Sequence, residues 1–256
     1  MGHLIKAEFY KLRKSLSYKV LLAAFLVFEI LFVRNEVTSG IRWTGIVYTG
    51  AEWLYRVPGQ ASYYVGFLYL FAADYVAGEF RNRTLVSGCL CGFLRRQVLY
   101  AKAAAYFAGI LPFMLIHTVT GPVVWTMQFG FGMGFNVDTI MLVLSTLLYC
   151  TLGHLVFGGM GFLGALIARN RIGTVGLSLG VSQILGIVNA NASLLENPVL
   201  TAILKLTIFF QLSEFLGNRP LIYTHVPLWV MVLTSVIAVA FILLLAKVHF
   251  EKHDLK

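Results

Sequence analysis

Residues 227–247 read PLWVMVLTSVIAVAFILLLAK. The first charged side chain in this stretch is Lys247, so the preceding run is apolar or weakly polar throughout. A helix of about 20 such residues has the length needed to cross the hydrocarbon core of a bilayer. We therefore predict a transmembrane helix over residues 227–246 that ends at Lys247.

The composition of the whole chain extends this interpretation. Hydrophobic residues make up 59% of the 256 residues, charged residues only 12%, and the mean hydropathy is +0.81. Soluble globular domains carry about 25% charged residues, so this chain has too little polar surface to cover itself in water. We predict an all-α polytopic membrane protein that forms one transmembrane domain over residues 1–256.

Five other segments also have the character of membrane spans. Pro112 and Pro122 fall inside one of them, and proline inside a helix kinks or breaks it. Residues 34–60 contain several Trp and Tyr, which favour the membrane interface, so we expect an external loop there. The six predicted transmembrane helices are 19–33, 61–78, 100–125, 139–168, 172–189 and 227–246.

Basic residues gather at one side of this topology. The net charge is +9, and under the six-helix topology 15 of the 20 Lys and Arg lie on the side of the N-terminus. Cytoplasmic loops carry such an excess, so both termini are predicted to be cytoplasmic. The basic residues are not interleaved with aromatic ones, and no nucleic-acid partner is expected.

Residues 190–226 leave an alternative topology open. Within them, residues 199–217 are apolar enough to span but include Lys205, Gln211 and Glu214. A span here would give seven helices and an external C-terminus. We prefer an external or re-entrant helix, with residues 190–226 as an external segment.

Two segments outside the spans are predicted to be cytoplasmic helices. In residues 1–18, Ile5, Phe9, Leu12 and Leu16 recur at helical spacing among basic residues. Such a helix suits a membrane surface or a partner protein, although it is equally consistent with a charged flank of the first span. Residues 79–98 carry a short apolar piece between basic ends, as in a helix that lies along the membrane.

Four ionisable residues fall within the predicted spans: Glu29, Asp74, His117 and His154. Such residues are costly in lipid and mark functional sites by default. Glu29 and Asp74 are candidates to face one cavity and hold a proton or a cationic group. Alternatively, both lie near helix ends and reach water or a basic partner.

Motifs for enzymes are weak in this chain. It contains no GxxxxGK[ST] or HExxH sequence, and its three cysteines give neither a disulfide framework nor a zinc site. Residues 176–180, GLSLG, fit the GxSxG pattern, but Ser178 lies inside an apolar segment. A pairing of Ser178 with His117 or His154 stays open as the least favoured alternative. The small residues of the later spans fit either a dimer interface or ordinary packing within one chain.

Three motifs occur in order in the first hundred residues: LIKAEFYKLRK (4–14), GEFRNRT (78–84) and GFLRRQV (92–98), the last followed by Lys102. Together they resemble the six-helix permease subunits of type-2 ABC exporters, in the bacterial branch that has no fused ATPase. Residues 4–14 resemble the opening interface helix of that family, and 78–98 its coupling segment. Leu94 departs from the usual Ser, and Cys89-Leu-Cys91 replaces a more polar piece.

The resemblance implies a transport subunit rather than an enzyme, located in the bacterial plasma membrane. It implies a homo- or heterodimer of permeases, and separate ATPase subunits that bind ATP and Mg. It also implies a hydrophobic or amphipathic substrate, as in lantibiotic immunity and peptide-antibiotic efflux, a form of antibiotic resistance. No cofactor or metal is expected in this chain. The residues expected to couple it to the ATPase are Glu79, Arg81, Thr84, Leu85, Gly92, Arg95 and Arg96. The main alternative is a proton-coupled secondary transporter that uses Glu29 or Asp74, although no internal repeat supports it.

Overall fold

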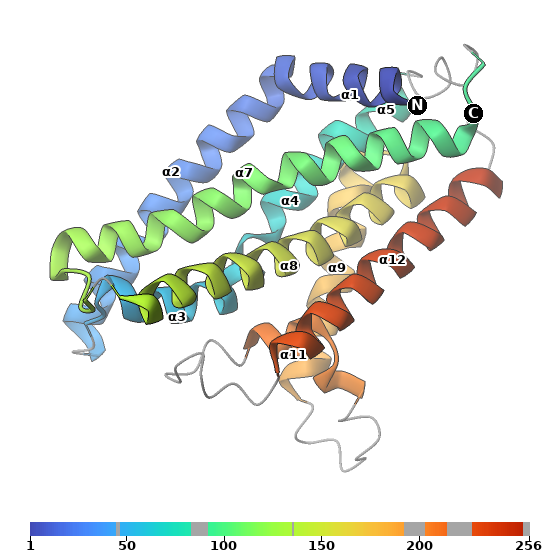
Figure 1. Cartoon of the computed structure of the whole chain (residues 1–256). Helices are drawn as coiled ribbons and strands as arrows, with labels where there is room; N and C mark the ends of the chain where they lie inside the picture. Colours follow the sequence, from blue (N-terminus) through green and yellow to red (C-terminus); the bar gives the residue numbers. More distant parts are fainter. Residues whose placement is uncertain (45–46, 83–91, 135, 192–202, 214–226, 253–256) are drawn as a thin grey trace.

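A computed structural model describes residues 1–44, 47–82, 92–134, 136–191, 203–213 and 227–252, and these residues form helices without any strand (Figure 1). The all-α prediction is confirmed for this part of the chain. The α-helices are α1 (Gly2–Lys14), α2 (Leu16–Ser39), α3 (Gly50–Gln60), α4 (Val65–Ala72), α5 (Gly78–Arg81), α7 (Arg95–Phe129), α8 (Val137–Ala168), α9 (Arg171–Ala190), α11 (Ile208–Ser213) and α12 (Leu228–Lys252). Shorter π- and 3₁₀-helical pieces are η1 (Gly40–Thr44), η2 (Ala61–Tyr64) and η3 (Ala73–Ala77).

Five helices in the described ranges are long and apolar enough to cross a membrane, namely α2, α7, α8, α9 and α12. They correspond to five of the six predicted spans. The remaining prediction, residues 61–78, falls on η2, α4, η3 and the first residue of α5, which follow α3 without a gap. Pro58 and Gly59 at the end of α3 disfavour a continuous α-helix. Each of these pieces is too short to cross a membrane by itself, so a sixth transmembrane helix stays a prediction. The five long apolar helices fit a multi-pass membrane protein.

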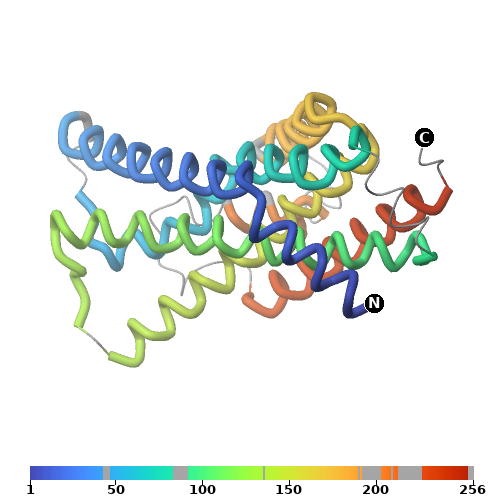
Figure 2. The backbone as a smooth tube through the Cα atoms, turned by 90° about the horizontal axis from the view of Figure 1, so that it is seen from above, coloured from blue at the N-terminus to red at the C-terminus, as the bar shows by residue number. Residues whose placement is uncertain are grey.

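The long helices run between two ends of the molecule (Figures 1 and 2). α1 lies across one end, and α3 and α11 lie at the other. The start of α7 and the end of α12 meet at the α1 end, where an Arg95 guanidinium N–H donates to the Glu251 carbonyl oxygen at 3.4 Å. The two terminal helices, α1 and α12, therefore reach the same end of the bundle.

The predicted external loop at residues 34–60 is largely helical instead. α2 continues to Ser39, and α3 packs between α7 and α8. Thr49 caps α3 in a reciprocal arrangement with Glu52, and the Trp53 ring is 1% exposed. The loop prediction was wrong because Trp53 and Val57 form part of a buried apolar stripe, which packs α3 against α7 and α8.

Pro112 and Pro122 do not break the helix that contains them. α7 is a single helix of 35 residues that contains both prolines. At 1.5 Å per residue it is about 52 Å long, which exceeds the hydrocarbon thickness of a bilayer. Proline is tolerated in such helices because neighbouring helices and side chains satisfy the backbone groups that it frees.

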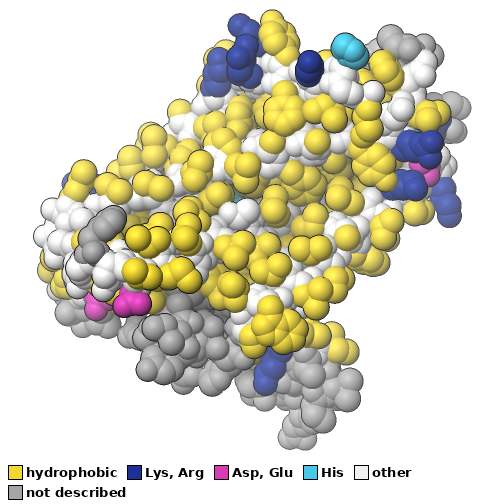
Figure 3. Space-filling view, in the orientation of Figure 1, with side chains coloured by type: hydrophobic (Ala, Val, Ile, Leu, Met, Phe, Trp, Pro, Cys, Tyr) yellow, Lys and Arg dark blue, Asp and Glu magenta, His cyan; other side chains and the backbone are white. Residues whose placement is uncertain are grey.

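The core between these helices is rich in aromatic side chains. Tyr106 is fully buried, stacks on Phe71, contacts the tilted Phe162 ring, and donates its hydroxyl hydrogen to the Gly158 carbonyl oxygen at 2.9 Å. Outside, Leu, Ile, Val and Phe side chains are exposed on the outer faces of α2, α7, α8, α9 and α12 (Figure 3). An apolar exterior around a packed core is the arrangement expected of a protein that is surrounded by lipid.

Glycines of α8 pack within the chain. A side chain at Gly158 would overlap Ile110, one at Gly161 would press on Tyr69, and one at Gly164 would overlap Ser178. Gly176 and Gly180 of α9 have open space instead. Ordinary packing between helices of one chain therefore explains the α8 glycines, while the α9 pair faces outward.

Part of the ambiguous segment 199–217 is described, as residues 203–213. It contains α11, whose Ile208 and Leu212 are buried against the main core. α11 lies at the end of the bundle opposite α1 (Figure 1). Whether the whole segment is external or re-entrant stays a prediction.

Candidate functional site

The N-terminal helix α1 packs on the start of α7. α1 ends at Lys14, and Ser15 then caps α2 by accepting a hydrogen bond from the Tyr18 N–H at 3.2 Å. The buried residues of α1 are Glu8 and Leu12. Phe9 of α1 and Leu16, the first residue of α2, are exposed. The predicted extent of 1–18 was thus too long, because Leu16 belongs to α2, and the predicted apolar face was partly wrong.

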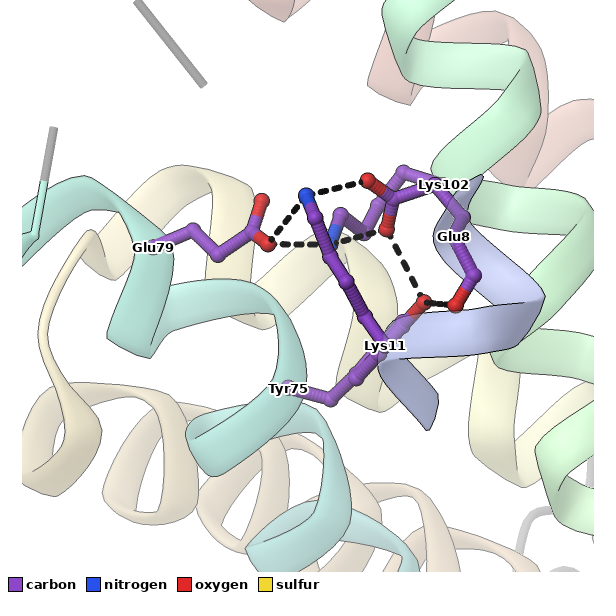
Figure 4. A network of polar contacts seen from close by, with 5 residues as sticks. All are labelled: Glu8, Lys11, Tyr75, Glu79 and Lys102. Atoms are coloured by element: carbon purple, nitrogen blue, oxygen red, sulfur yellow. Dashed lines mark hydrogen bonds and ion pairs between the residues drawn. The ribbon is translucent and has the colours of Figure 1, made fainter. Parts of the chain in front are cut away.

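Two carboxylates and two lysines meet where α1, α5 and α7 come together (Figure 4). The Lys102 Nζ lies 2.6 Å from the Glu8 Oε2 and 2.7 Å from the Glu79 Oε1. The Lys11 Nζ lies 2.6 Å from the Glu8 Oε1 and 3.3 Å from the same Glu79 oxygen. We call these four residues the ion cluster. It joins helices that are far apart in sequence by alternating opposite charges.

The Tyr75 side chain of η3 completes the surroundings of Lys102. Its hydroxyl donates to the Glu8 Oε2 at 3.0 Å, and its ring centroid lies 4.1 Å from the Lys102 Nζ. The Lys102 side chain is only 2% exposed. Burying a charged lysine is costly unless opposite charges lie beside it, and here two carboxylates and an aromatic face surround the ammonium group.

The surroundings of α1 shift the pKa values of two members of the ion cluster. Burial by itself raises the pKa of Glu8, but the charge and hydrogen bond of Lys102, helped by Lys11, outweigh burial and bring this pKa below its ordinary value. Burial lowers the pKa of Lys11, but its hydrogen bonds and charge interactions with Glu8 and Glu79 raise it more, so the net shift is upward. Both shifts favour the charged forms.

The predicted coupling residues fall into different surroundings. Glu79 belongs to the ion cluster, Arg81 is exposed at the end of α5, and Arg96 is exposed in the first turn of α7. Arg95 reaches the end of α12. Gly92 has a φ of +87°, a left-handed conformation in which glycine is favoured, just before α7. Thr84 and Leu85 lie outside the described residues.

Sequence reasoning missed Glu8, Lys11 and Tyr75, and it treated Lys102 only as a basic flank. A signal for Glu8 was present. It lies three residues after Ile5 and four before Leu12, so a carboxylate interrupts the apolar stripe of α1. A charge on the buried face of a helix calls for a partner from another helix.

A second polar group lies deeper in the bundle, between α2, η2, α7 and α8. The His117 Nδ1 is 3.1 Å from the Glu29 Oε1, and its Nε2 is 3.0 Å from the Val57 carbonyl oxygen. The His154 ring lies 5.4 Å from the His117 ring between centroids, and the Tyr64 ring lies 4.5 Å away on another side. We call Glu29, Tyr64, His117 and His154 the buried polar group.

Several polar atoms of this group lack a hydrogen-bond partner within the described part of the chain. They are the Glu29 Oε2, the Tyr64 hydroxyl and the His154 Nε2, all three buried, although the Tyr64 hydroxyl and the Glu29 carboxylate lie close enough to interact with each other. Buried groups that are left unsatisfied cost about 1–3 kcal/mol each.

Asp74 does not join Glu29. The Asp74 Oδ1 lies 2.5 Å from the Arg171 Nη2, and its side chain is 32% exposed. Glu29 and Asp74 therefore do not share a cavity. Glu29 contacts His117, whereas Asp74 pairs with a basic residue, which was the alternative prediction.

Ser178 lies at a helix contact. Its Oγ is buried next to Gly164 and has no hydrogen-bond partner among the described residues. The two histidines considered as its base are engaged elsewhere, His117 with Glu29 and His154 with the Cys150 carbonyl oxygen at 2.8 Å. This geometry gives no support to a nucleophile paired with a base.

No family model matches the chain, and no curated protein matches it either. Over the described residues, no group of three or more His, Cys, Asp or Glu is placed to hold a metal ion. Any proposal for the function therefore rests on the helical membrane architecture, the ion cluster and the buried polar group.

Proposed function

We propose that this chain is the membrane permease subunit of an ATP-driven exporter of a hydrophobic or amphipathic substrate. It would have six transmembrane helices and both termini in the cytoplasm of a bacterium. The observation that carries the proposal is the ion cluster. Glu79, in the segment GEFRNRT, forms ion pairs with Lys102 of α7 and with Lys11 of α1.

The ion cluster suits the transmission of movement. A soluble ATPase bound to residues 79–98 would push on a segment whose two ends are anchored, one through Glu79 and the other through α7. Because α1 shares the same charges, α1 would move with them. The partner ATPase would supply ATP and Mg, and binding of ATP would favour the state in which these contacts fit best.

The remaining parts of the proposal follow the resemblance. A second permease, identical or different, would pair with this one in the membrane. Residues 61–78 would supply the second crossing, since α4 and η3 within them pack against α8 and α9. A peptide antibiotic such as a lantibiotic is the substrate class that the resemblance favours.

Co-purification tests the proposal directly. We would isolate the tagged protein in mild detergent and look for a P-loop ATPase, comparing the wild type with the double variant Arg81→Ala, Arg96→Ala. Both side chains are exposed at the α1 end, so the fold should persist. Arg34→Ala, exposed at the other end of α2, is the matched control.

We expect an ATPase to accompany the wild type and Arg34→Ala, and to be lost with the double variant. Monodisperse wild-type protein without any ATPase would contradict the exporter proposal. An ATPase that remains with the double variant would contradict the proposed contact surface.

The buried polar group favours a second candidate, a proton-coupled secondary transporter that uses Glu29. The two candidates differ in their energy source. In inverted membrane vesicles, uptake of a labelled lantibiotic peptide by an exporter would need ATP and would survive a protonophore. A proton-coupled carrier would work without ATP, stop with the protonophore, and fail in Glu29→Gln.

A further inference from the structure

An apolar groove of about 670 Å³ opens on the outer surface of the bundle between the start of α2, the α4–η3 run and the start of α9. These helices lie along one side of the molecule (Figure 2). The groove is lined mainly by apolar and aromatic side chains, including Tyr18, Leu21, Leu70, Phe71, Ile172 and Val175. Gly176 also lines it, and open space adjoins the position where a side chain would be.

A second cavity of about 440 Å³ adjoins the groove, because Arg171 and Ile172 line both. Arg81 and Arg169 line this second cavity as well. The Arg169 guanidinium lies 5.8 Å from the Phe80 ring centroid, which holds its charge at the rim.

Charge distinguishes the two parts of this site. Among the described lining residues, three arginines surround the second cavity, and Asp74, the one acidic residue of either lining, pairs with Arg171. The formal charges of these described lining residues, three arginines and one aspartate, sum to +2. The mouth of the apolar groove lies at the α1 end, where most Lys and Arg of the described residues gather (Figure 3).

We propose that the joined cavities bind one anionic phospholipid of the surrounding bilayer, with an acyl chain in the apolar groove and the phosphate beside Arg81 and Arg169. An apolar slot open toward lipid, with cations at its mouth, matches the two halves of such a molecule. Arginine is also suited to phosphate, because its planar donors form paired hydrogen bonds. The inference does not depend on an ATPase partner.

Charge also argues against a second copy of the chain as the occupant. Two copies with the same orientation in the membrane hold their basic ends at the same level. Packing this face on itself would bring like charges together, which is unfavourable. A lipid with a negative headgroup neutralises them instead.

Binding of fluorescent phospholipids to the purified full chain in non-ionic detergent tests the proposal. Phosphatidylglycerol and phosphatidylcholine with identical labelled acyl chains would be titrated against the wild type. We expect phosphatidylglycerol to bind about tenfold more tightly, because each basic residue near a phosphate favours anionic lipid. Equal affinity for the two lipids would overturn the proposal.

Two pairs of variants locate the site. Arg81→Gln with Arg169→Gln should abolish the preference for phosphatidylglycerol, whereas Lys6→Gln, an exposed residue of α1 outside the cavities, should keep it. Gly176→Leu should weaken the binding of both lipids, because the leucine side chain would fill the groove. Gly186→Leu, on the same helix with equally open space but outside the groove, should change neither.

Each remaining outcome counts against the proposal. A preference that survives the arginine variants places the lipid elsewhere. If Gly176→Leu alters self-association but leaves lipid binding intact, the groove is an interface between copies. If the variants impair only binding of a labelled lantibiotic, the groove belongs to the substrate.

Discussion

Lys102 is the central residue of the ion cluster, through which we propose that the ATPase acts on the membrane helices. Its charge is buried in a chain with few charges, and it contacts Glu8 from α1 and Glu79 from α5. A charge that is desolvated in this way is tolerated only while its partners stay in place. The ion cluster is therefore expected to act as a unit, so that the loss of one carboxylate is felt on all three helices.

Glu8→Gln should lower the free energy of unfolding by about 2 kcal/mol, the usual loss when a hydrogen bond to a charged group is removed. Lys102 would keep Glu79 but lose its contact with the Glu8 carboxylate. Unfolding by SDS in detergent micelles measures the change. Lys6→Gln, exposed on the same helix, should be neutral, and equal stability of the two variants would contradict the role given to Glu8.

The contribution of Glu8 should depend on pH in a defined direction. Because the pKa of Glu8 is lowered in the folded protein from its ordinary value of 4.5, its stabilisation is present above pH 4.5 and is lost as pH falls through the folded pKa. The stability difference between wild type and Glu8→Gln should therefore be constant from pH 7 to pH 5 and shrink at lower pH. A difference that grows on acidification would show the opposite shift.

Glu29 offers a test inside the bundle. Glu29→Ala leaves the His117 Nδ1 without its hydrogen-bond partner and opens a cavity, and it should destabilise by about 3 kcal/mol. Glu29→Gln keeps an acceptor and the side-chain volume, and should cost about 1 kcal/mol or less. SDS unfolding of the two variants checks this order. Equal losses would mean that the contact with His117 carries little energy.

At the scale of elements, helix contacts in this bundle depend on glycines at close approaches. In α8, Gly161 faces Tyr69 and Ala72 of α4, and an added Cβ would lie 2.9 Å from the tyrosine ring. At Gly180 in α9, an added Cβ would meet no atom within 4 Å. The same residue type therefore has different roles in adjacent helices.

Gly161→Ala should destabilise the bundle by about 1–3 kcal/mol, because overpacking displaces α8 from α4. Gly180→Ala should be neutral or slightly stabilising, since alanine is the better helix former and nothing is displaced. Thermal unfolding in detergent compares the pair. Equal melting temperatures would show that the contact between α4 and α8 is looser than the structure indicates.

At the scale of the whole molecule, charge is distributed unevenly between the two ends. α1, the starts of α2, α7 and α9, and the ends of α5, α8 and α12 meet at the α1 end (Figure 1). These stretches carry the basic residues Lys6, Lys11, Arg13, Lys14, Lys19, Arg81, Arg95, Arg96, Lys102, Arg169, Arg171, Lys247 and Lys252. Acidic residues such as Glu52 and Asp138 lie at the start of helices at the other end. This distribution supports the proposed cytoplasmic position of the α1 end.

Cysteine labelling with a membrane-impermeant reagent tests the orientation. Single cysteines would be placed at the exposed positions Lys6 and Glu251, and at Glu52 and Asp138, in a variant without native cysteines. In intact cells, only the cysteines at positions 52 and 138 should react. After lysis all four should react, and labelling at position 251 but not at position 6 in intact cells would instead favour an odd number of crossings.

The sequence by itself determined the membrane class, the all-helical architecture and five long helices, because about twenty apolar residues in a row have no other stable fate in lipid. It also identified Glu29, Asp74, His117 and His154 as costly residues. Hydropathy could not identify α3 as a buried helix, because residues 50–60 include the charged Glu52 and Arg56 and the polar Gln60.

Only the tertiary structure decided which charges meet. Lys102 lies 94 residues from Glu8 in sequence and 23 from Glu79, and no local pattern relates them. Their pairing depends on how α1 packs across α7, which follows from side-chain shape and volume at the contact. The same reason separates Asp74 from Glu29, because each carboxylate pairs with the nearest cation or imidazole that the packed helices present.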